Sequence, residues 1–531
     1  MFARQRDLRT IRVYDVQYAV MDARLIAAAA ACVALAGAAP ADAAAPFTAT
    51  SGLFPAAPAL PHGARNDNAE PGIAVDGRGA FFAVGNIHIV GGATHDTRGA
   101  GEPGVDIWRS LDHGRSYRWI ASPFNTTPVT SGIGGFDADI AAARYPNTRG
   151  HHNVYAVSTA LSSTALAMSD DGGGTWRLAP PGFVSVAPAD RPWLVAEGAC
   201  GLYLVYHQFS TDATAVTHLS TCSSDLQNAA GSPFAQLASF AGDPNPGESF
   251  GHPAVDDSPS STHRGALYVP ELGCALPNGL PYLVGRFEES AGECPTHLYL
   301  KVLRYNPASS SFSTRVAVPS IGGRIIPFWS SATAVDAAGR VYVVYHERHH
   351  AYLVSSGDGG NHWTRPTQVD RAPARAGAYP SIAAGRAGRL AITFFGADRR
   401  SAVDDVAVKG MGTPGDPKAA AWRVFVARSR DSGKHLAQRA VTRVIHRGAV
   451  CVNGTGCGLN DSRALLDLTA TALDPATGIA GSAYTTDPDA AFFRVASGYT
   501  TAGELRKKPP PKPHHPRTRH RRPHRHRHTD R

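Results

Sequence analysis

The chain has 531 residues, 43% of them hydrophobic, which is enough for a large packed core, and its 54 glycines and 39 prolines are typical of a chain with many turns. The net charge of +9 comes from one end, because residues 505–531 hold 11 Lys and Arg against a single acid, Asp530. The rest of the chain is close to neutral, which argues against a nucleic-acid-binding fold with a basic surface.

Residues 1–45 have the composition of an export signal. Met21–Arg24 is a short charged start, Leu25–Ala39 is an apolar run, and Ala41-Asp-Ala43 fits a small-residue cleavage site. The apolar run is too short and too rich in alanine for a good membrane span, so we expect no transmembrane segment in the mature chain. We expect translation to begin at Met21, and the protein to be secreted or attached to the cell envelope through a bacterial-type export signal.

Small-residue runs recur along residues 46–502. They are 70–75, 137–142, 191–195, 252–255, 331–335, 379–383 and 467–471. Each is followed by a β-branched or aromatic run that a turn residue opens. These second runs are 79–84, 153–157, 201–206, 265–269, 339–345, 388–394 and 478–484. The order predicts seven units of short strands, with the small residues in an innermost strand crowded around an axis.

A turn motif, S-x-D-x-G-x-x-W, occurs between later strands of several units. Its copies are Ser110–Tyr117, Ser169–Trp176, Ser356–Trp363 and the weaker Ser429–Leu436. An Asp carboxylate can accept hydrogen bonds from turn N–H groups, and Gly takes positive φ without steric cost. The acids expected to do this are Asp112, Asp171, Asp358 and Asp431.

These units predict an all-β fold, a β-propeller of seven four-stranded antiparallel blades, with six or eight blades as alternatives. The seventh unit supplies only three clear strands. Phe47–Leu53 is extended and can provide the fourth, which would close the ring and remove an unpaired sheet edge. We expect the body to be a monomer.

Six cysteines lie beyond the export signal, and an even number in an exported chain suggests disulfides. Fifteen pairings are possible. Proximity in sequence favours three local pairs: Cys200–Cys222, Cys274–Cys294 and Cys451–Cys457.

The repeated turn motif resembles that of the BNR/Asp-box repeat proteins, the superfamily that contains sialidases. The resemblance implies a propeller, but the activities of that superfamily are mixed. A sialidase needs an arginine cluster for the substrate carboxylate, a Tyr–Glu pair and an acid. Arg399 or Arg400 could join Arg191 and Arg324 in such a cluster. The family's early Arg-Ile-Pro signature is absent from the first unit, and Arg324-Ile-Ile-Pro327 only echoes it.

Three long insertions, 86–105, 271–297 and 396–421, all join second and third strands, which places them on the face opposite the Asp boxes. The residues that enter the innermost strands lie on that same face, at the mouth of the channel. Catalytic candidates are Glu70, Asp137, Tyr379 and Glu271. Ligand-binding candidates are Arg191, Arg324, His252, Asp190 and His346. We expect Arg191→Ala and Arg324→Ala to lose ligand at an unchanged melting temperature, and Asp171→Ala to lose stability first.

His346-Glu-Arg-His-His350 matches the zinc-protease motif H-E-x-x-H. That chemistry needs both histidines on one face of a helix. Strand-like runs flank this segment on both sides, so we predict a hairpin loop, and we expect neither a metal nor a cofactor.

Two main functions remain open. The first is a module that binds a glycan or a protein at the channel mouth, and the second is an exo-glycosidase of sialidase type that acts on an anionic sugar. A surface or assembly scaffold is a third. Residues 503–531 are rich in Lys, Arg, His and Pro, so we expect a disordered tail that is simply solvated, attaches to anionic cell-envelope polymers, or binds metal through its histidines.

Overall fold

The computed structural model describes residues 47–504, with gaps at 59–65, 67, 88–103, 125–136, 161–162, 180–188, 209–212, 221, 223–234, 242–249, 276–293, 295–296, 324–329, 401–410, 414, 453–464, 466–467 and 488–495. The chain divides into two units, 1–43 and 44–531, and every described residue belongs to the second. The predicted export signal, nearly all of the predicted tail and the predicted site residue Arg324 therefore lie outside the described residues.

All the regular structure in the described part of the chain is β-strand, arranged in seven sheets. The first blade contains β2 (Asn68–Val75), β3 (Phe81–Ile87), β4 (Val105–Ser110) and β5 (Arg118–Ala121). The second contains β6 (Ala138–Ala142), β7 (Val154–Ala160), β8 (Ser163–Ser169) and β9 (Arg177–Leu178). The third contains β10 (Ala189–Glu197), β11 (Gly201–Gln208), β12 (Ala213–Ser220) and β13 (Ala235–Ala241).

The remaining blades follow the same order along the chain. The fourth contains β14 (Ala254–Val255), β15 (Leu267–Ala275), β16 (His297–Asn306) and β17 (Ser311–Ile321). The fifth contains β18 (Ser331–Val335), β19 (Val341–Glu347), β20 (His350–Ser356) and β21 (Thr367–Gln368). The sixth contains β22 (Ala376–Ala384), β23 (Leu390–Ala397), β24 (Ala421–Ser429) and β25 (Ala437–Ala440), and β26 (His446–Arg447) also pairs with β24. The seventh contains β27 (Thr469–Leu473), β28 (Ala480–Thr486), β29 (Ala496–Glu504) and β1 (Phe47–Leu53).

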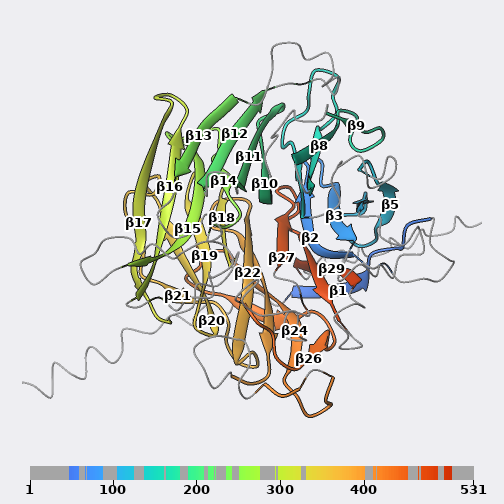
Figure 1. Cartoon of the computed structure of the whole chain (residues 1–531), viewed down its shortest axis with the longest axis vertical. Helices are drawn as coiled ribbons and strands as arrows, with labels where there is room; N and C mark the ends of the chain where they lie inside the picture. Colours follow the sequence, from blue (N-terminus) through green and yellow to red (C-terminus); the bar gives the residue numbers. More distant parts are fainter. Residues whose placement is uncertain are drawn as a thin grey trace, which may run out of the picture. The chain divides into compact units, whose positions relative to one another are not determined.

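The innermost strands form a closed ring, because β2, β6, β10, β14, β18, β22 and β27 contact one another in that order and β27 contacts β2. Figure 1 shows several of these strands gathered near the centre, with the outer strands of each blade further out. Seven hydrophobic clusters of described residues fill the gaps between successive blades. The predicted all-β propeller with seven four-stranded blades is confirmed, and the alternatives of six and eight are excluded.

The N-terminal strand closes the ring, as the sequence predicted. β1 pairs antiparallel with β29, with Phe47 opposite Glu504 and Leu53 opposite Gly498. Phe47 is only 4% exposed, and Phe54 directly after the strand is 2% exposed and stacks on Trp108 with ring centroids 4.7 Å apart. β29 runs to Glu504, two residues beyond the predicted end of the propeller at 502.

The four Asp boxes adopt one turn geometry. In the second box, Asp171 Oδ1 accepts bonds from the N–H groups of Gly174 and Thr175 at 2.8 and 2.9 Å. Ser169 Oγ donates to the same carboxylate and accepts from Gly173 N–H, and Gly173 has φ of +83°. In the other three boxes the Ser and Gly residues make the same contacts, and each Asp carboxylate accepts a bond from the N–H group four residues further on. The serine joins both halves of the turn, which explains its place in the motif.

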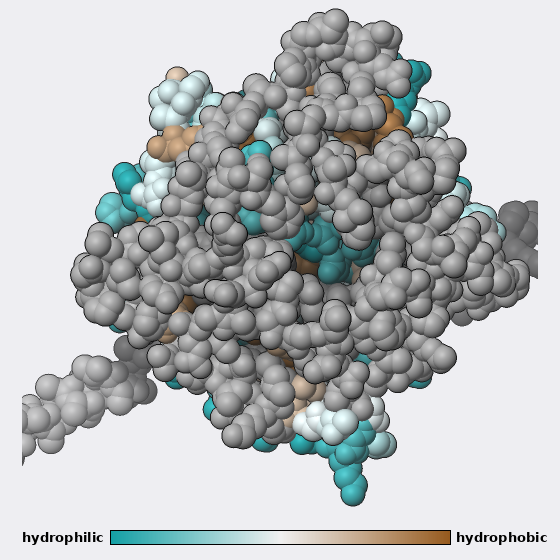
Figure 2. All heavy atoms as spheres, in the orientation of Figure 1, coloured by the Kyte–Doolittle hydropathy of each residue, from teal (hydrophilic) through white to brown (hydrophobic). Residues whose placement is uncertain are grey.

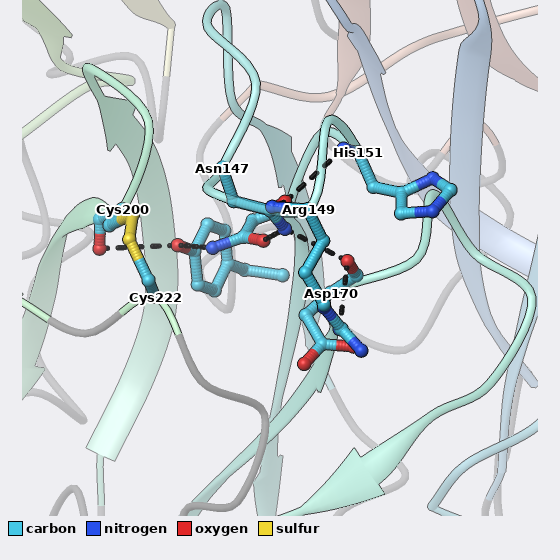
Figure 3. Close-up of a disulfide and its surroundings, with 8 residues drawn as sticks. Asn147, Arg149, His151, Asp170, Cys200 and Cys222 are labelled. Carbon is cyan, nitrogen blue, oxygen red and sulfur yellow. Dashed lines mark hydrogen bonds and ion pairs between the residues drawn. A yellow bond between two sulfur atoms is a disulfide. The ribbon is translucent and has the colours of Figure 1, made fainter.

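Two of the predicted disulfides are present, Cys200–Cys222 and Cys274–Cys294. Figure 3 shows the first beside a turn of the second blade. The hydroxyl of Tyr155, in β7, donates to the Cys200 carbonyl at 3.2 Å. Cys451 is also disulfide-bonded, while its predicted partner Cys457 lies outside the described residues. Each of the two bridges joins cysteines of one blade, as expected.

The H-E-x-x-H segment is a hairpin, as predicted. Glu347 at the end of β19 pairs directly with His350 at the start of β20, and Arg348 in the turn has φ of +56°. The two histidines of the motif therefore do not share a helical face, and the zinc-protease interpretation is excluded for this segment. Within the described residues, no helix is long and apolar enough to cross a membrane.

Candidate functional site

Three inner strands share an unusual backbone feature near their N-terminal ends. Glu70, Arg191 and Tyr379 each precede a proline, have φ of +45°, +46° and +50°, and lie at a break in strand register. Positive φ in a residue other than glycine costs about 1–3 kcal/mol, and the residue before proline is restricted further. Bulges of this kind redirect side chains and gather beside functional sites. The repeated feature in β2, β10 and β22 therefore marks one end of the ring as the candidate site.

A buried ionic cluster, which we call the mouth cluster, joins three successive blades at this end. It consists of Glu70 from β2, Asp137 just before β6, and Asp190 and Arg191 from β10. Arg191 Nη2 lies 2.7 Å from Glu70 Oε2 and 2.7 Å from Asp137 Oδ1, so the guanidinium reaches past the second blade to the first. The Arg191 side chain is 3% exposed, that of Glu70 9% and that of Asp137 17%.

Further contacts fix the orientation of the mouth cluster. Asn86 at the end of β3 donates to Glu70 Oε2 at 3.2 Å, and the backbone N–H of Arg191 donates to Asp190 Oδ1 at 2.8 Å. The guanidinium also lies over the ring of Trp193, 5.4 Å from its centroid, which is a cation–π contact. Contacts within the protein thus hold both the backbone N–H and the guanidinium of Arg191.

The electrostatics of the mouth cluster move the titration of one carboxyl toward neutral pH. Burial raises the pKa of Asp137 to about 6, and the negative charge of Asp190 adds to the rise, while Arg191 opposes it. Burial acts against the charge of Arg191, but Asp137, Glu70 and Asp190 together raise its pKa, so it stays a cation. Three carboxyls surround one guanidinium, so the cluster carries a net negative charge, which increases when Asp137 ionises.

We expect the free energy of unfolding to fall, through Asp137, by on the order of 3 kcal/mol as pH rises from about 4 to above 6. The pKa of this carboxyl is raised from 3.8 to about 6 in the folded protein, so the folded state binds the proton more tightly and ionisation opposes folding. Asp137→Asn should remove this part of the pH dependence. Urea unfolding of both proteins at pH 4 and pH 7.5 measures it, and a constant difference between them at the two values would contradict it.

The other predicted catalytic residues lie in different surroundings. Tyr379 is 2% exposed, and its hydroxyl donates to the Cys451 carbonyl at 2.9 Å. Glu271 was expected to open a long loop, but β15 continues through it to Ala275, and its carboxylate pairs with Lys301 Nζ at 3.3 Å. The longer strand replaces the predicted loop start because residues 267–275 pair continuously with β16.

The predicted ligand-binding residues also separate. Arg191 and Asp190 belong to the mouth cluster, His252 lines the central cavity, and Arg324 lies outside the described residues. His346 is fully buried, and burial lowers its pKa to about 3, which keeps the ring neutral. Arg399, a further arginine considered for the sialidase cluster, is 43% exposed and donates to the Lys418 carbonyl.

A second ion pair spans alternate blades just inside the mouth cluster. His252 Nε2, before β14, lies 3.2 Å from Asp139 Oδ2 of β6, and Asp139 also accepts a bond from Leu194 N–H at 2.8 Å. Burial opposes the charged imidazole, but the Asp139 carboxylate outweighs it and raises the pKa of His252. Trp193 lies between the two ion pairs, with its ring 4.9 Å from the imidazole of His252.

The inner strands enclose a central cavity of about 280 Å³. All seven contribute to its wall, and nearly half of the lining residues are alanines, serines and threonines. His252 and Tyr379 line it near the mouth cluster, and Arg144 and Asp257, which follow β6 and β14, line it toward the Asp-box face. Figure 2 shows hydrophilic residues in a hollow near the middle of the face in view.

Sequence reasoning missed Asp139 and Trp193. Both lie in runs that were recognised as inner strands, two residues after Asp137 and Arg191 respectively. Residues two apart on a regular strand lie on the same face, which was the available signal for Asp139, whereas the bulge between Asp190 and Trp193 removes that signal for Trp193. In the described part of the chain, no group of three or more His, Cys, Asp or Glu residues is placed to hold a metal ion.

The seven blades define a seven-bladed β-propeller, and the repeated S-x-D-x-G-x-x-W turn recurs in four of them. No protein-family model and no curated protein matches the chain.

Among solved structures, the chain is similar to a GH93 α-L-arabinofuranosidase of Fusarium graminearum, at 9% identity over 86% of this chain and 97% of that one, with a TM-score of 0.39. It is also similar to the NanB sialidase of Streptococcus pneumoniae, at 10% identity over 83% of this chain and 69% of that one, with a TM-score of 0.39. A third similar structure is the intramolecular trans-sialidase of Ruminococcus gnavus, at 13% identity over 83% of this chain and 96% of that one, with a TM-score of 0.37. These similarities are too loose to indicate an activity, and the fold is established by the sheets themselves.

Proposed function

We propose that the protein is an exported glycan-binding propeller whose mouth cluster receives a neutral or cationic sugar. The observation that carries this proposal is the pairing of Arg191 with Glu70 and Asp137 at 2.7 Å each. The charge of this buried guanidinium is already balanced by two carboxylates, so a carboxylate on a ligand would add a negative charge that no cation of the mouth cluster offsets. Sugar hydroxyls and amino groups, in contrast, can donate to the surrounding acidic oxygens.

The charge of the mouth cluster separates this proposal from a sialidase-type enzyme. With three carboxyls around one guanidinium, an anionic sugar would meet like charge in a poorly solvated place, which is costly. Disulfides such as Cys200–Cys222 fit an oxidising compartment, where exported glycan-binding proteins work.

A second candidate function, glycoside hydrolysis, is favoured by one observation, the pKa of Asp137. A carboxyl with a pKa of about 6 can serve as a general acid near neutral pH. Glu70 and Asp137 both reach the same Arg191 nitrogen at 2.7 Å, so their nearest oxygens lie no more than twice that distance apart. In this candidate Asp137 would protonate the leaving group and Glu70 would be its partner.

A glycan array beside a panel of fluorogenic glycosides, at pH 5 and pH 7, tests both candidates. We expect neutral or amino sugars to bind, and Asp137→Asn to weaken binding about tenfold or more, because a hydrogen bond to a charged group contributes about 1.5–3 kcal/mol. The matched control is Asp257→Asn. Burial raises the pKa of Asp257 to about 6 as well, but this residue lies at the other end of the cavity, so binding should stay within about twofold.

The outcomes of this test are distinct. Fluorophore release that Asp137→Asn abolishes would assign the hydrolase function. Binding limited to sialylated or other anionic glycans, without turnover, would overturn both candidates, and so would the absence of any binding and turnover.

A further inference from the structure

The wall of the central cavity differs from one side to the other. On the β22 and β27 side, hydroxyls satisfy one another: Ser381 Oγ lies 2.9 Å from Thr469 Oγ1 and 2.6 Å from Thr471 Oγ1. Thr471 also donates to Thr393 Oγ1 at 2.8 Å. This side is a closed hydrogen-bonded seam between the sixth and seventh blades.

On the β10 and β18 side, polar atoms of the cavity wall have no such partners. Trp193 Nε1, Ser331 Oγ and Thr333 Oγ1 are buried, and none has a hydrogen-bond partner among the described residues. The three residues are 6%, 2% and 3% exposed. A buried polar group without a partner costs about 1–3 kcal/mol, so three around one cavity indicate that something else satisfies them.

The ion pair between His252, just before β14, and Asp139 of β6 leaves this wall without net charge. His252 Nδ1 lies 3.0 Å from the Pro253 carbonyl oxygen, which can only accept, so this nitrogen carries a proton. His252 Nε2 faces the Asp139 carboxyl, and one further proton lies between them. Whichever partner holds that proton, the pair is neutral overall. The His252 side chain is 37% exposed, whereas Trp193, Ser331 and Thr333 are buried.

We propose that the central cavity is a second binding site, distinct from the mouth cluster, which takes a small neutral polyol, with Trp193, Thr333 and His252 as its polar contacts. The indole N–H donates to a ligand oxygen, and the Thr333 hydroxyl can both donate and accept. The small apolar residues of the remaining wall leave room for the carbon skeleton. A volume of about 280 Å³ is roughly nine times the ~30 Å³ share of one water, which suits a molecule of about ten heavy atoms, such as a pentitol.

Other ligand classes fit less well. A free carboxylate would bring an unpaired charge into a cavity whose own ion pair is already balanced, and burying an unpaired charge is expensive. An apolar ligand would leave the indole N–H and the two hydroxyls unsatisfied. Water alone could satisfy them, because buried waters bond to about three polar groups each, and water alone is therefore the outcome that the experiment must distinguish.

The test is a titration of the full ¹⁵N-tryptophan-labelled protein with xylitol, observed through the indole N–H resonances. Trp193→Phe keeps an aromatic ring and assigns the resonance by its disappearance. We expect a saturable shift of that resonance with xylitol, and none with acetate at the same concentration. Thr333→Val should raise the dissociation constant for xylitol at least tenfold, which corresponds to about 1.4 kcal/mol.

Thr471→Val is the matched control, because Thr471 lines the same cavity but its hydroxyl is already bonded within the seam. It should lower the melting temperature and leave xylitol affinity within about twofold. Thr333→Val should instead weaken xylitol binding and keep or raise the melting temperature, because it removes a hydroxyl that has no hydrogen-bond partner.

Three results would overturn the proposal. The absence of a saturable shift with xylitol would mean that the cavity holds water only. A shift with acetate alone would mean that the site takes anions. An unchanged affinity of Thr333→Val for xylitol would mean that xylitol binds elsewhere. None of these depends on the glycan array, because Asp137→Asn changes the mouth cluster and leaves Trp193 and Thr333 intact.

Discussion

Deletion of residues 46–54 is expected to unfold the propeller or to lower its melting temperature by more than 10 °C. The deletion removes the outer strand of the seventh blade, whose pairing with β29 runs from Phe47 to Leu53. It also removes the buried rings of Phe47 and Phe54, and the loss of a buried phenylalanine side chain alone costs about 3–5 kcal/mol. The newly exposed edge of β29 would in addition favour aggregation.

Two controls separate ring closure from a general effect of truncation. Deletion of residues 506–531 leaves β29 whole, so the melting temperature should stay within about 1 °C. Phe54→Ala should cost about 3–5 kcal/mol, whereas Thr50→Ala, at an exposed position of β1, should cost less than about 0.5 kcal/mol. Equal melting temperatures of the two truncated proteins would exclude β1 as the closing strand.

The elements that sequence alone predicted are the ones that local pattern determines. The Asp boxes are complete within eight residues, because Ser169, Asp171 and Gly173 bond to each other and to the turn between them. The division of the chain into units of short strands is equally local, since turn residues and short apolar runs alternate along the sequence. Closure by Phe47–Leu53 followed from counting, because six units had four strands and the seventh had three.

The site was predicted less well because its contacts join distant parts of the chain. Arg191 and Glu70 are 121 positions apart and skip a blade, and His252 and Asp139 are 113 apart and do the same. The repeat along the sequence does not reveal that the guanidinium of one blade contacts a carboxylate two blades away. One signal was present, the proline after Glu70, Arg191 and Tyr379, which recurs at the three strained bulges. Its meaning depends on positive φ, which the sequence does not display.

The burial of Arg191 also changes what its removal should do. As a ligand-binding residue at an open mouth, it was expected to be dispensable for stability. The structure shows a guanidinium that is 3% exposed and paired with two buried carboxylates. Breaking a buried ion pair by removing one partner leaves an uncompensated charge and typically costs about 3–5 kcal/mol.

Arg191→Leu is therefore expected to lower the free energy of unfolding by about 3–5 kcal/mol at pH 7.5, measured by urea unfolding. The loss should shrink at pH 5, because the pKa of Asp137 already lies at about 6 with Arg191 present and rises further without it. A protonated carboxyl no longer needs the guanidinium, so the penalty belongs to the ionised form.

The double variant Glu70→Gln/Arg191→Leu provides the matched control, since it removes one of the carboxylates that would otherwise lose its counter-ion together with the arginine. It should recover at least about 1 kcal/mol relative to Arg191→Leu, which a double-mutant cycle would report as coupling between the two residues. If both variants lose the same free energy, and the loss does not change between pH 5 and pH 7.5, then Arg191 stabilises the ring through packing on Trp193 rather than through charge.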